Sequence, residues 1–133
     1  MKHEVIITID GKEILNIPKD TEVCEYHSTA RIWDWKEMHG VMDSTHGLYF
    51  LKLNETFATE KLGVKGYLFL NEVYDMLGLT LTAEGAVLGW VYEKGKYVDF
   101  GIMSEENSEA INGYKSEFIL RFNVDGCILE HLS

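Results

Sequence analysis

The stretch that most limits the fold of this chain is residues 66–90, GYLFLNEVYDMLGLTLTAEGAVLGW, where apolar residues are densest. Three acidic residues and several glycines interrupt it, so it holds no apolar span of about 20 residues and we predict no transmembrane helix. Apolar side chains recur there with the spacing of one helical face, at Leu70, Val73, Tyr74 and Leu77. We therefore expect a helix that buries this face in a core and ends at Gly78.

The composition indicates one folded domain that spans residues 1–133. A chain of 133 residues with 46% hydrophobic and 26% charged residues is long enough to bury a core of its own. Its 22 acidic residues face 12 basic ones, which gives a formal net charge of -10. A field of this sign repels nucleic acid and anionic lipid and attracts a protein with a basic surface, although solubility alone would also explain it. We expect no direct nucleic-acid binding and no membrane association.

The two cysteines, Cys24 and Cys127, are too few and too distant in sequence for a disulfide framework or a four-ligand zinc site. We predict that both are reduced and act as small hydrophobic residues of an intracellular protein. The N-terminal run MKHEVIITIDGKE has an apolar part too short for a secretory signal peptide. The expected location is the cytoplasm.

Turn dipeptides between apolar runs predict β-hairpins at Asp10-Gly11, Lys94-Gly95 and Asp125-Gly126. Pro18 is expected to end the second strand of the first hairpin. Residues 48–53, LYFLKL, predict a further strand, and residues 21–46 predict one or two strands with a loop. Antiparallel strands are therefore expected to dominate both ends of the chain.

Helices are expected between these strands. After the strand at 48–53, we predict a short helix that is capped by Asn54 or Thr56 and ends at Gly63. A second short helix is capped by Thr82, and residues 104–115, SEENSEAINGYK, form either a capped helical turn or an acidic loop. The predicted fold is a single α+β domain, with a mainly antiparallel sheet built from hairpins and two or three short helices packed on it.

No motif in the sequence predicts a reaction, a cofactor or a metal. Cys24 and His27 form a C-x-x-H pair, and His39, Asp43 and His46 lie within eight residues of one another, but neither spacing matches a zinc site. The sequence has no G-x-S-x-G elbow, P-loop or dinucleotide fingerprint. We therefore predict no catalytic, cofactor-binding or metal-binding residue.

Two groups of residues are candidates for contact with a partner. Glu105, Glu106 and Glu109 form a local acidic cluster, which is either a solvated loop or a contact surface for lysine and arginine side chains. In the run RIWDW, strand alternation places Trp33 and Trp35 on one face. A buried pair is the default, and if both are exposed they are candidates for a binding hot spot.

Residues 43–103 carry a pattern that resembles a known group of proteins. The pattern consists of YLFLNE at a helix start (67–72), LGL at its end (77–79), EG (84–85), and LGW before a strand (88–90). It is similar to the soluble C-terminal region of an uncharacterised family encoded by phages and prophages of Gram-positive gut anaerobes. This resemblance implies a phage or prophage accessory gene, and hence a location in the cytoplasm of an infected host or in the virion. It carries no activity and no catalytic residue over to this chain.

The resulting hypothesis is a small, acidic, non-enzymatic protein of phage or prophage origin that binds a host or phage protein with a basic surface, one such role being to counter a host defence. A first alternative is a structural or assembly component of the virion, which requires a self-associating strand edge or a hydrophobic patch. A second is a small-ligand binder or an enzyme, which requires a polar pocket that gathers His27, His39 or His46 with carboxylates.

Overall fold

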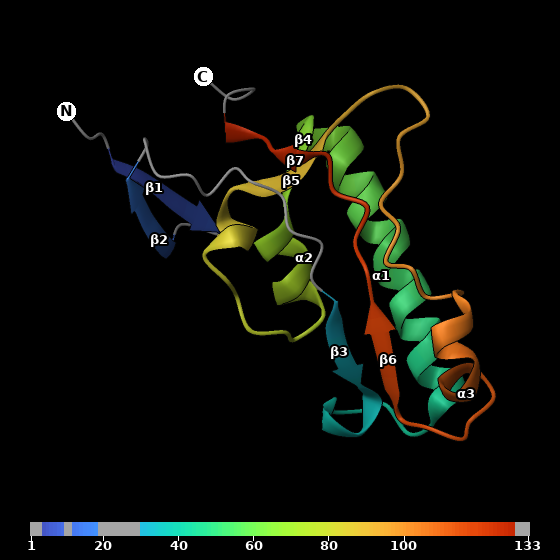
Figure 1. The fold of residues 1–133 in the computed structure, drawn as a ribbon. Helices are drawn as coiled ribbons and strands as arrows, with labels where there is room; N and C mark the ends of the chain where they lie inside the picture. Colours follow the sequence, from blue (N-terminus) through green and yellow to red (C-terminus); the bar gives the residue numbers. More distant parts are fainter. Residues whose placement is uncertain (1–3, 10–11, 19–29, 130–133) are drawn as a thin grey trace.

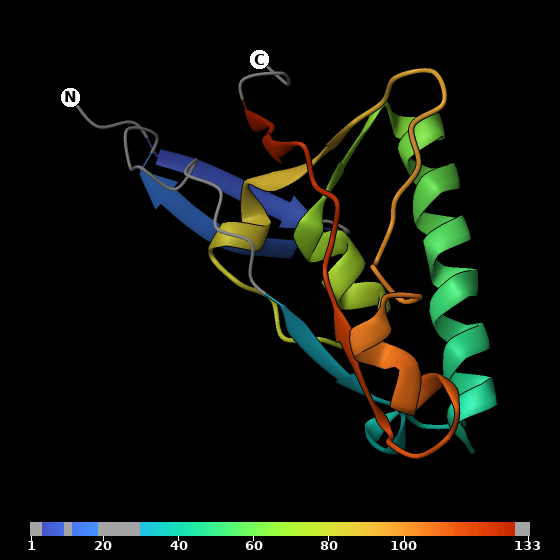
Figure 2. The same ribbon diagram turned by 45° about the vertical axis from the view of Figure 1, so that its right-hand side comes forward.

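The computed structural model describes residues 4–9, 12–18 and 30–129, and Figure 1 shows how their elements are arranged. A long helix, α1, forms the right-hand edge of the molecule in Figure 2. The strands are β1 (Glu4–Ile9), β2 (Lys12–Pro18), β3 (Arg31–Asp34), β4 (Tyr67–Phe69), β5 (Leu88–Val91), β6 (Glu117–Leu120) and β7 (Gly126–Cys127). The helices are α1 (Ser44–Lys65), α2 (Leu70–Met76) and α3 (Ser108–Ile111), with 3-10 turns η1 (Trp35–Glu37), η2 (Glu84–Ala86) and η3 (Glu105–Asn107).

The strands pair antiparallel in small groups. β1 pairs with β2, β3 pairs with β6, and β5 lies between β4 and β7. The register of the second pair sets Trp33 opposite Phe118. The prediction of an N-terminal hairpin is confirmed, and Pro18 is the last residue of β2. The predicted turn at Asp10-Gly11 lies outside the described residues.

The other two predicted hairpins are wrong. A turn does form at Gly95, where φ is 83° and Lys96 N donates to Glu93 O at 2.9 Å, but the chain after it does not pair back onto β5. Asp125 and Gly126 lead into β7, which pairs with β5, while β6 pairs with β3. Because β4 and β7 occupy the two edges of β5, that strand has no edge left for the segment after Gly95.

The predicted strand at 48–53 is wrong, and the helix predicted after it is present but has neither the predicted cap nor the predicted end, because both segments belong to the 22-residue helix α1. Asp43 caps this helix by accepting a hydrogen bond from His46 N at 2.8 Å, and Gly66 ends it in the left-handed conformation with φ 86°. Gly63 therefore lies inside the helix instead of ending it. The apolar residues of 48–53 occupy both faces of α1, so this window shows no single-face helical period.

Helix α2 confirms the helix predicted within residues 66–90. Its predicted apolar face is buried at every position: Leu70, Val73, Tyr74 and Leu77. Gly78 follows with φ 74°. The second short helix, predicted with Thr82 as its cap, is only the 3-10 turn η2, whose N-cap residue is Ala83, although Thr82 Oγ1 accepts a hydrogen bond from Gly85 N at 2.9 Å. In the described part of the chain, no helix has both the length and the apolar content needed to cross a membrane.

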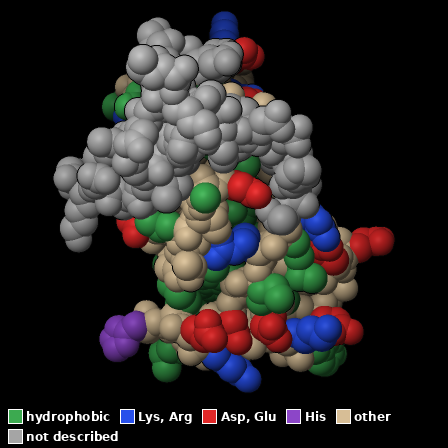
Figure 3. All heavy atoms as spheres, turned by 60° about the vertical axis from the view of Figure 1, so that its left-hand side comes forward, with side chains coloured by type: hydrophobic (Ala, Val, Ile, Leu, Met, Phe, Trp, Pro, Cys, Tyr) green, Lys and Arg blue, Asp and Glu red, His purple; other side chains and the backbone are tan. Residues whose placement is uncertain are grey.

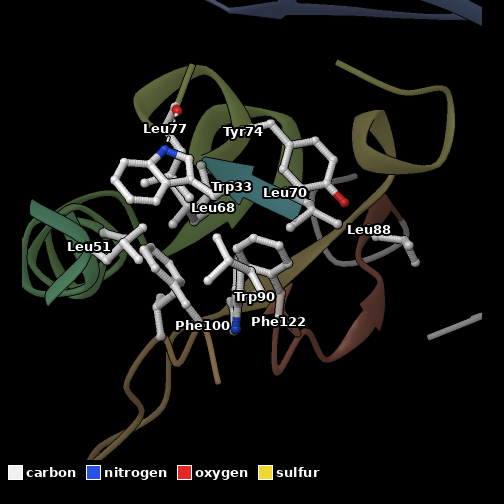
Figure 4. Close-up of a cluster of buried hydrophobic side chains, with 14 of the residues drawn as sticks. Trp33, Leu51, Leu68, Leu70, Tyr74, Leu77, Leu88, Trp90, Phe100 and Phe122 are labelled. Atoms are coloured by element: carbon white, nitrogen blue, oxygen red, sulfur yellow. Dashed lines mark hydrogen bonds between the residues drawn. The ribbon is translucent and has the colours of Figure 1, made fainter. Parts of the chain in front are cut away.

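A core of aromatic and aliphatic side chains joins α1, α2 and the two sheets that contain β3 and β5 (Figure 4). Trp33 stacks on Phe50 with ring centroids 5.4 Å apart, and its Nε1 donates to Leu77 O at 3.0 Å. Trp90 Nε1 donates to Asn123 Oδ1, also at 3.0 Å. Each large side chain buried in this way stabilises the fold by about 1.5–3 kcal/mol. The predicted α+β class is thus confirmed, with residues 104–115 forming η3 and α3 and with α1 longer than the short helices expected.

Candidate interaction surfaces

The predicted acidic cluster lies on η3 and α3, beside the N-terminal half of α1 (Figures 1 and 2). Glu105, Glu106 and Glu109 are all exposed. Arg121 donates to both carboxylate oxygens of Glu106, at 2.8 and 3.2 Å, and these hydrogen bonds lower the pKa of Glu106. Lys115 lies 3.0 Å from Glu109, and this contact raises the pKa of Lys115. Within the described residues Glu105 is the member without an ion pair, so the cluster presents one uncompensated charge.

The predicted tryptophan pair does not share one strand face, because β3 ends at Asp34 and Trp35 begins the turn η1. Trp33 is only 1% exposed, whereas Trp35 is half-buried and its Nε1 donates to Ser44 Oγ at 3.0 Å. Both indoles press on Gly47 of α1, where an added Cβ would lie 3.1 Å from Trp35 and 3.2 Å from Trp33. The two tryptophans therefore dock β3 and η1 onto α1, and Trp33 has no surface to offer a partner.

The residues considered for metal binding are not brought together. His39 and His46 are exposed, and His46 Nδ1 lies 3.4 Å from Asp43 Oδ1. No group of three or more histidine, cysteine, aspartate or glutamate side chains suited to a metal ion occurs among residues 30–129, whose side chains the structure describes. Cys127 is disulfide-bonded, so the prediction of a reduced thiol at this position is wrong. Cys24 and His27 lie outside the described residues.

Glu55 and Asp99 are two neighbouring carboxylates, an arrangement that can perform acid–base chemistry. Glu55 Oε2 accepts a hydrogen bond from Phe100 N at 2.7 Å, and Asp99 Oδ1 accepts one from Gly101 N at 2.8 Å. Burial raises the pKa of Glu55; the hydrogen bond from Phe100 N opposes this shift, and the nearby charge of Asp99 adds to it. Glu55 therefore anchors this segment to α1, whereas Asp99 binds the backbone of its own segment.

Glu72 is a buried carboxylate that links α1 to α2. Its Oε1 lies 2.6 Å from Lys65 Nζ and 3.2 Å from Lys61 Nζ, and its Oε2 accepts a hydrogen bond from Phe69 N at 2.9 Å. Burial alone would raise the pKa of Glu72, but the hydrogen bonds from Lys65 and Phe69 outweigh it, and the pKa is lowered. All the contacts of this carboxylate are internal, so its role is structural.

The exposed charge of the molecule is predominantly acidic, because ion pairs occupy most of the described lysines and arginines. These pairs join Lys61 and Lys65 to Glu72, Lys96 to Asp125, Lys115 to Glu109, and Arg121 to Glu106. The exposed lysines that form no ion pair within the described residues are Lys36, Lys52 and Lys94. We use the name acidic exterior for the exposed carboxylates that likewise form none: Glu37, Glu60, Asp75, Glu93, Glu105 and Glu117.

The acidic exterior is spread over the surface. On the face drawn in Figure 3, acidic and basic side chains lie next to one another along the lower edge. A partner attracted by the excess of carboxylates would therefore respond to the summed field of the molecule, since no single dense acidic patch is visible on this face.

A second surface was not predicted from the sequence and lies on the outer face of α1. We use the name outer ridge for its exposed apolar side chains, Tyr49, Leu53, Phe57 and Val64, which are 67%, 36%, 49% and 88% exposed. Their spacing places them on one side of the helix, opposite the buried side that carries Leu51, Ala58 and Leu62. In Figure 2 no described segment lies beyond α1 on its outer side. A row of exposed apolar side chains on one helix is typical of a contact surface.

The sequence contained a signal for the outer ridge. Two helical periods run interleaved through residues 44–65, one through the buried positions and one through the exposed positions. A search for a single apolar stripe misses both, because together they fill opposite sides of the helix.

The chain belongs to DUF6353, a family of unknown function, because the sequence model of this family matches residues 3–132. This match covers nearly the whole chain, further than the residues 43–103 on which the resemblance was based, and the description names neither a phage nor a group of organisms. No curated protein matches the chain, and no solved structure does.

Proposed function

We propose that this member of DUF6353 is a small, acidic, non-enzymatic protein that acts by binding another protein, one with a basic surface. The observation that carries the proposal is the acidic exterior. Ion pairs inside the molecule occupy most of its described cations, so the charge left for a partner is mainly that of carboxylates. Such a field raises the rate of encounter with a basic protein and disfavours acidic competitors.

The proposal includes an origin in a phage or prophage and a location in the cytoplasm of the host, where binding a host protein would serve to counter a defence. The support for this part is the sequence resemblance over residues 43–103, whereas the disulfide bond of Cys127 counts against the cytoplasm, where disulfides are rare. The family description is compatible with it and adds no support.

The test is capture of partners from the lysate of a Gram-positive gut anaerobe on the immobilised chain, at about 50 mM and about 500 mM salt. We expect a partner that binds saturably at low salt and is not retained at high salt. A variant in which Glu37, Asp75, Glu93, Glu105 and Glu117 are replaced by their amides should lose it at low salt as well. The matched control replaces Lys36 and Lys94 by glutamine and should bind at least as well as the wild type. Recovery of no protein at either salt concentration contradicts the proposal.

A second candidate function is assembly into a virion, and the outer ridge favours it, because such a role requires a hydrophobic patch that can associate. Mass spectrometry of purified particles tests this alternative. Detection of the chain at a fixed ratio to the capsid protein supports it, and absence of the chain from the particles excludes it.

A further inference from the structure

We propose that the outer ridge of α1 packs against the outer ridge of a second copy of this chain, with the two helices antiparallel and a two-fold axis at Thr56. The helix has 22 residues and is therefore about 33 Å long, enough for several turns to meet. Its outer face carries the apolar side chains Tyr49, Leu53, Phe57 and Val64, none of which is buried.

The charge on this face favours a second copy over a basic partner. Lys52 and Glu60 are the exposed residues of α1 that carry a full charge and form no ion pair within the described part of the chain. They cancel, so the face is nearly neutral in a chain of net charge -10. A strongly basic protein gains little electrostatic attraction here and would be drawn to the rest of the acidic exterior.

The positions of these charges select one register. Lys52 and Glu60 each lie four residues from Thr56, on opposite sides of it. A two-fold axis at Thr56 therefore sets Lys52 of each copy opposite Glu60 of the other, and the contact contains two identical ion pairs. Two-fold interfaces are self-complementary in this way, and they close at two copies.

The same register places a large side chain of one copy opposite a glycine of the other. Tyr49 and Gly63 each lie seven residues from Thr56, so Tyr49 of one copy meets Gly63 of the other. Gly63 is exposed, and a Cβ added there would find its nearest neighbour, Tyr92 Cε2, at 3.8 Å. The surface at Gly63 thus has room for an aromatic ring beside Tyr92.

Other arrangements are less favourable. An axis shifted by half a residue, to lie between Thr56 and Phe57, would set Lys52 opposite Lys61 and lose the reciprocal pairs. A parallel pair would place the two acidic α3 regions side by side, since α3 lies beside the N-terminal half of α1 (Figures 1 and 2). The antiparallel pair places them at opposite ends, where their repulsion is smallest.

This inference does not require the proposed function, because, of the acidic exterior, only Glu60 lies on the outer face of α1. A dimer formed through α1 would leave most of the acidic exterior free and would present it twice, which increases the avidity for a partner with two basic sites.

The first test is sedimentation equilibrium of the purified chain from about 5 µM to about 500 µM, since an interface built on one helix is expected at the weak end of specific interfaces. We expect a reversible monomer–dimer equilibrium. Lys52→Glu and Glu60→Lys should each weaken the dimer about tenfold, because each replaces two attractions by two repulsions. The double variant should restore the wild-type affinity. The proposal is overturned if the chain remains monomeric at every concentration, in which case the outer ridge would be left to a different protein. It is also overturned if the double variant fails to restore the dimer.

The second test distinguishes the proposed register from any other dimer. In Thr56→Cys the new thiols lie next to the two-fold axis, so mild oxidation should yield a covalent dimer in high proportion. In Val64→Cys each thiol lies about 12 Å along the helix from the axis, so the two are about 24 Å apart and should not cross-link. Equal cross-linking of the two variants, or cross-linking of Val64→Cys alone, rules out the register.

Discussion

The two faces of α1 carry similar side chains in opposite environments. On the inner face Leu51 and Leu62 are 0% exposed, whereas Leu53 on the outer face is 36% exposed and Phe57 is 49% exposed. Leu51 and Leu53 are two residues apart on one helix, so local sequence and helix propensity cannot account for the difference. What separates them is the tertiary core, which packs against one face of the helix and leaves the apolar side chains of the other face exposed.

This comparison shows that the apolar residues of a helix indicate that it packs against something, but they do not indicate whether a given face packs in the core of the same chain or against another molecule. The inner face contributes to folding, because its burial removes apolar surface from water in every molecule. The outer face contributes nothing of this kind to a monomer. If it contributes free energy at all, it does so in a complex, which makes its effect dependent on concentration.

The largest expected effect is on the inner face. Leu51→Ala should lower the free energy of unfolding by about 2–5 kcal/mol, since it removes a fully buried side chain and leaves a cavity. The matched change on the outer face, Leu53→Ala, should alter it by less than about 0.5 kcal/mol. Urea unfolding at low protein concentration measures both. Equal losses for the two variants would mean that the outer face is packed in the monomer.

A smaller effect on stability is expected at the C-terminal end of α1, where Glu72 of α2 pairs with Lys61 and Lys65. Glu72→Gln keeps an acceptor for Phe69 N but loses the charge that binds Lys61 and Lys65, so we expect a loss of about 1–3 kcal/mol. Glu60→Gln, on the outer face, is the control and should change stability by less than about 0.5 kcal/mol. Because the folded-state pKa of Glu72 is lowered, its contribution is present above about pH 4.5 and is lost as the pH falls through the folded-state pKa. If the loss of unfolding free energy caused by Glu72→Gln did not become smaller at acidic pH, the ion pair with the lysines would not be the source of that loss.

The glycines of the two faces sharpen the comparison further. In Gly47→Ala the new methyl group would lie 3.1 Å from Trp35 and 3.2 Å from Trp33, so crowding should outweigh the gain in helix propensity and cost about 1 kcal/mol. In Gly63→Ala the nearest atom lies at 3.8 Å, so the same change should stabilise the monomer by about 0.5–1 kcal/mol. Thermal unfolding of both variants reports the signs, and stabilisation by Gly47→Ala would contradict the packing described for the inner face.

Sequence reasoning succeeded where one physical signal acted alone. Helix α2 was predicted because its apolar positions share one face, and the first hairpin was predicted because its strands are adjacent in sequence. Helix α1 was missed because apolar residues on both faces remove the single period. The partners of β6 and β7 were missed because pairing with β3 and β5 depends on which strand edges the rest of the fold leaves open.

In the candidate interaction surfaces too, features set by the local sequence were predictable and features set by tertiary contacts were not. That Glu105, Glu106 and Glu109 would be exposed follows from their local sequence, and it is confirmed. The ion pair of Glu106 does not follow, because Arg121 reaches it from a segment 15 residues away. Trp33 is buried, as the default expectation had it, but its contacts with Gly47 and Phe50 depend on the first half of α1, which was not predicted as a helix.

The smallest expected effect comes from Glu55, whose carboxylate is only partly buried and is therefore screened by solvent. Its folded-state pKa is raised, so the folded protein retains the proton at pH values where the unfolded chain has released it. The contribution of Glu55 to stability is therefore fully present below about pH 4.5 and declines as the pH rises through the folded-state pKa. The free energy of unfolding of the wild type, measured relative to Glu55→Gln between about pH 4 and pH 7, should fall as the pH increases. Asp99→Asn should reduce this slope, because it removes the negative charge that adds to the shift. A difference between wild type and Glu55→Gln that rises with pH would mean that the carboxylate is stabilised in its ionised form, and that Phe100 N and Lys52 outweigh its burial.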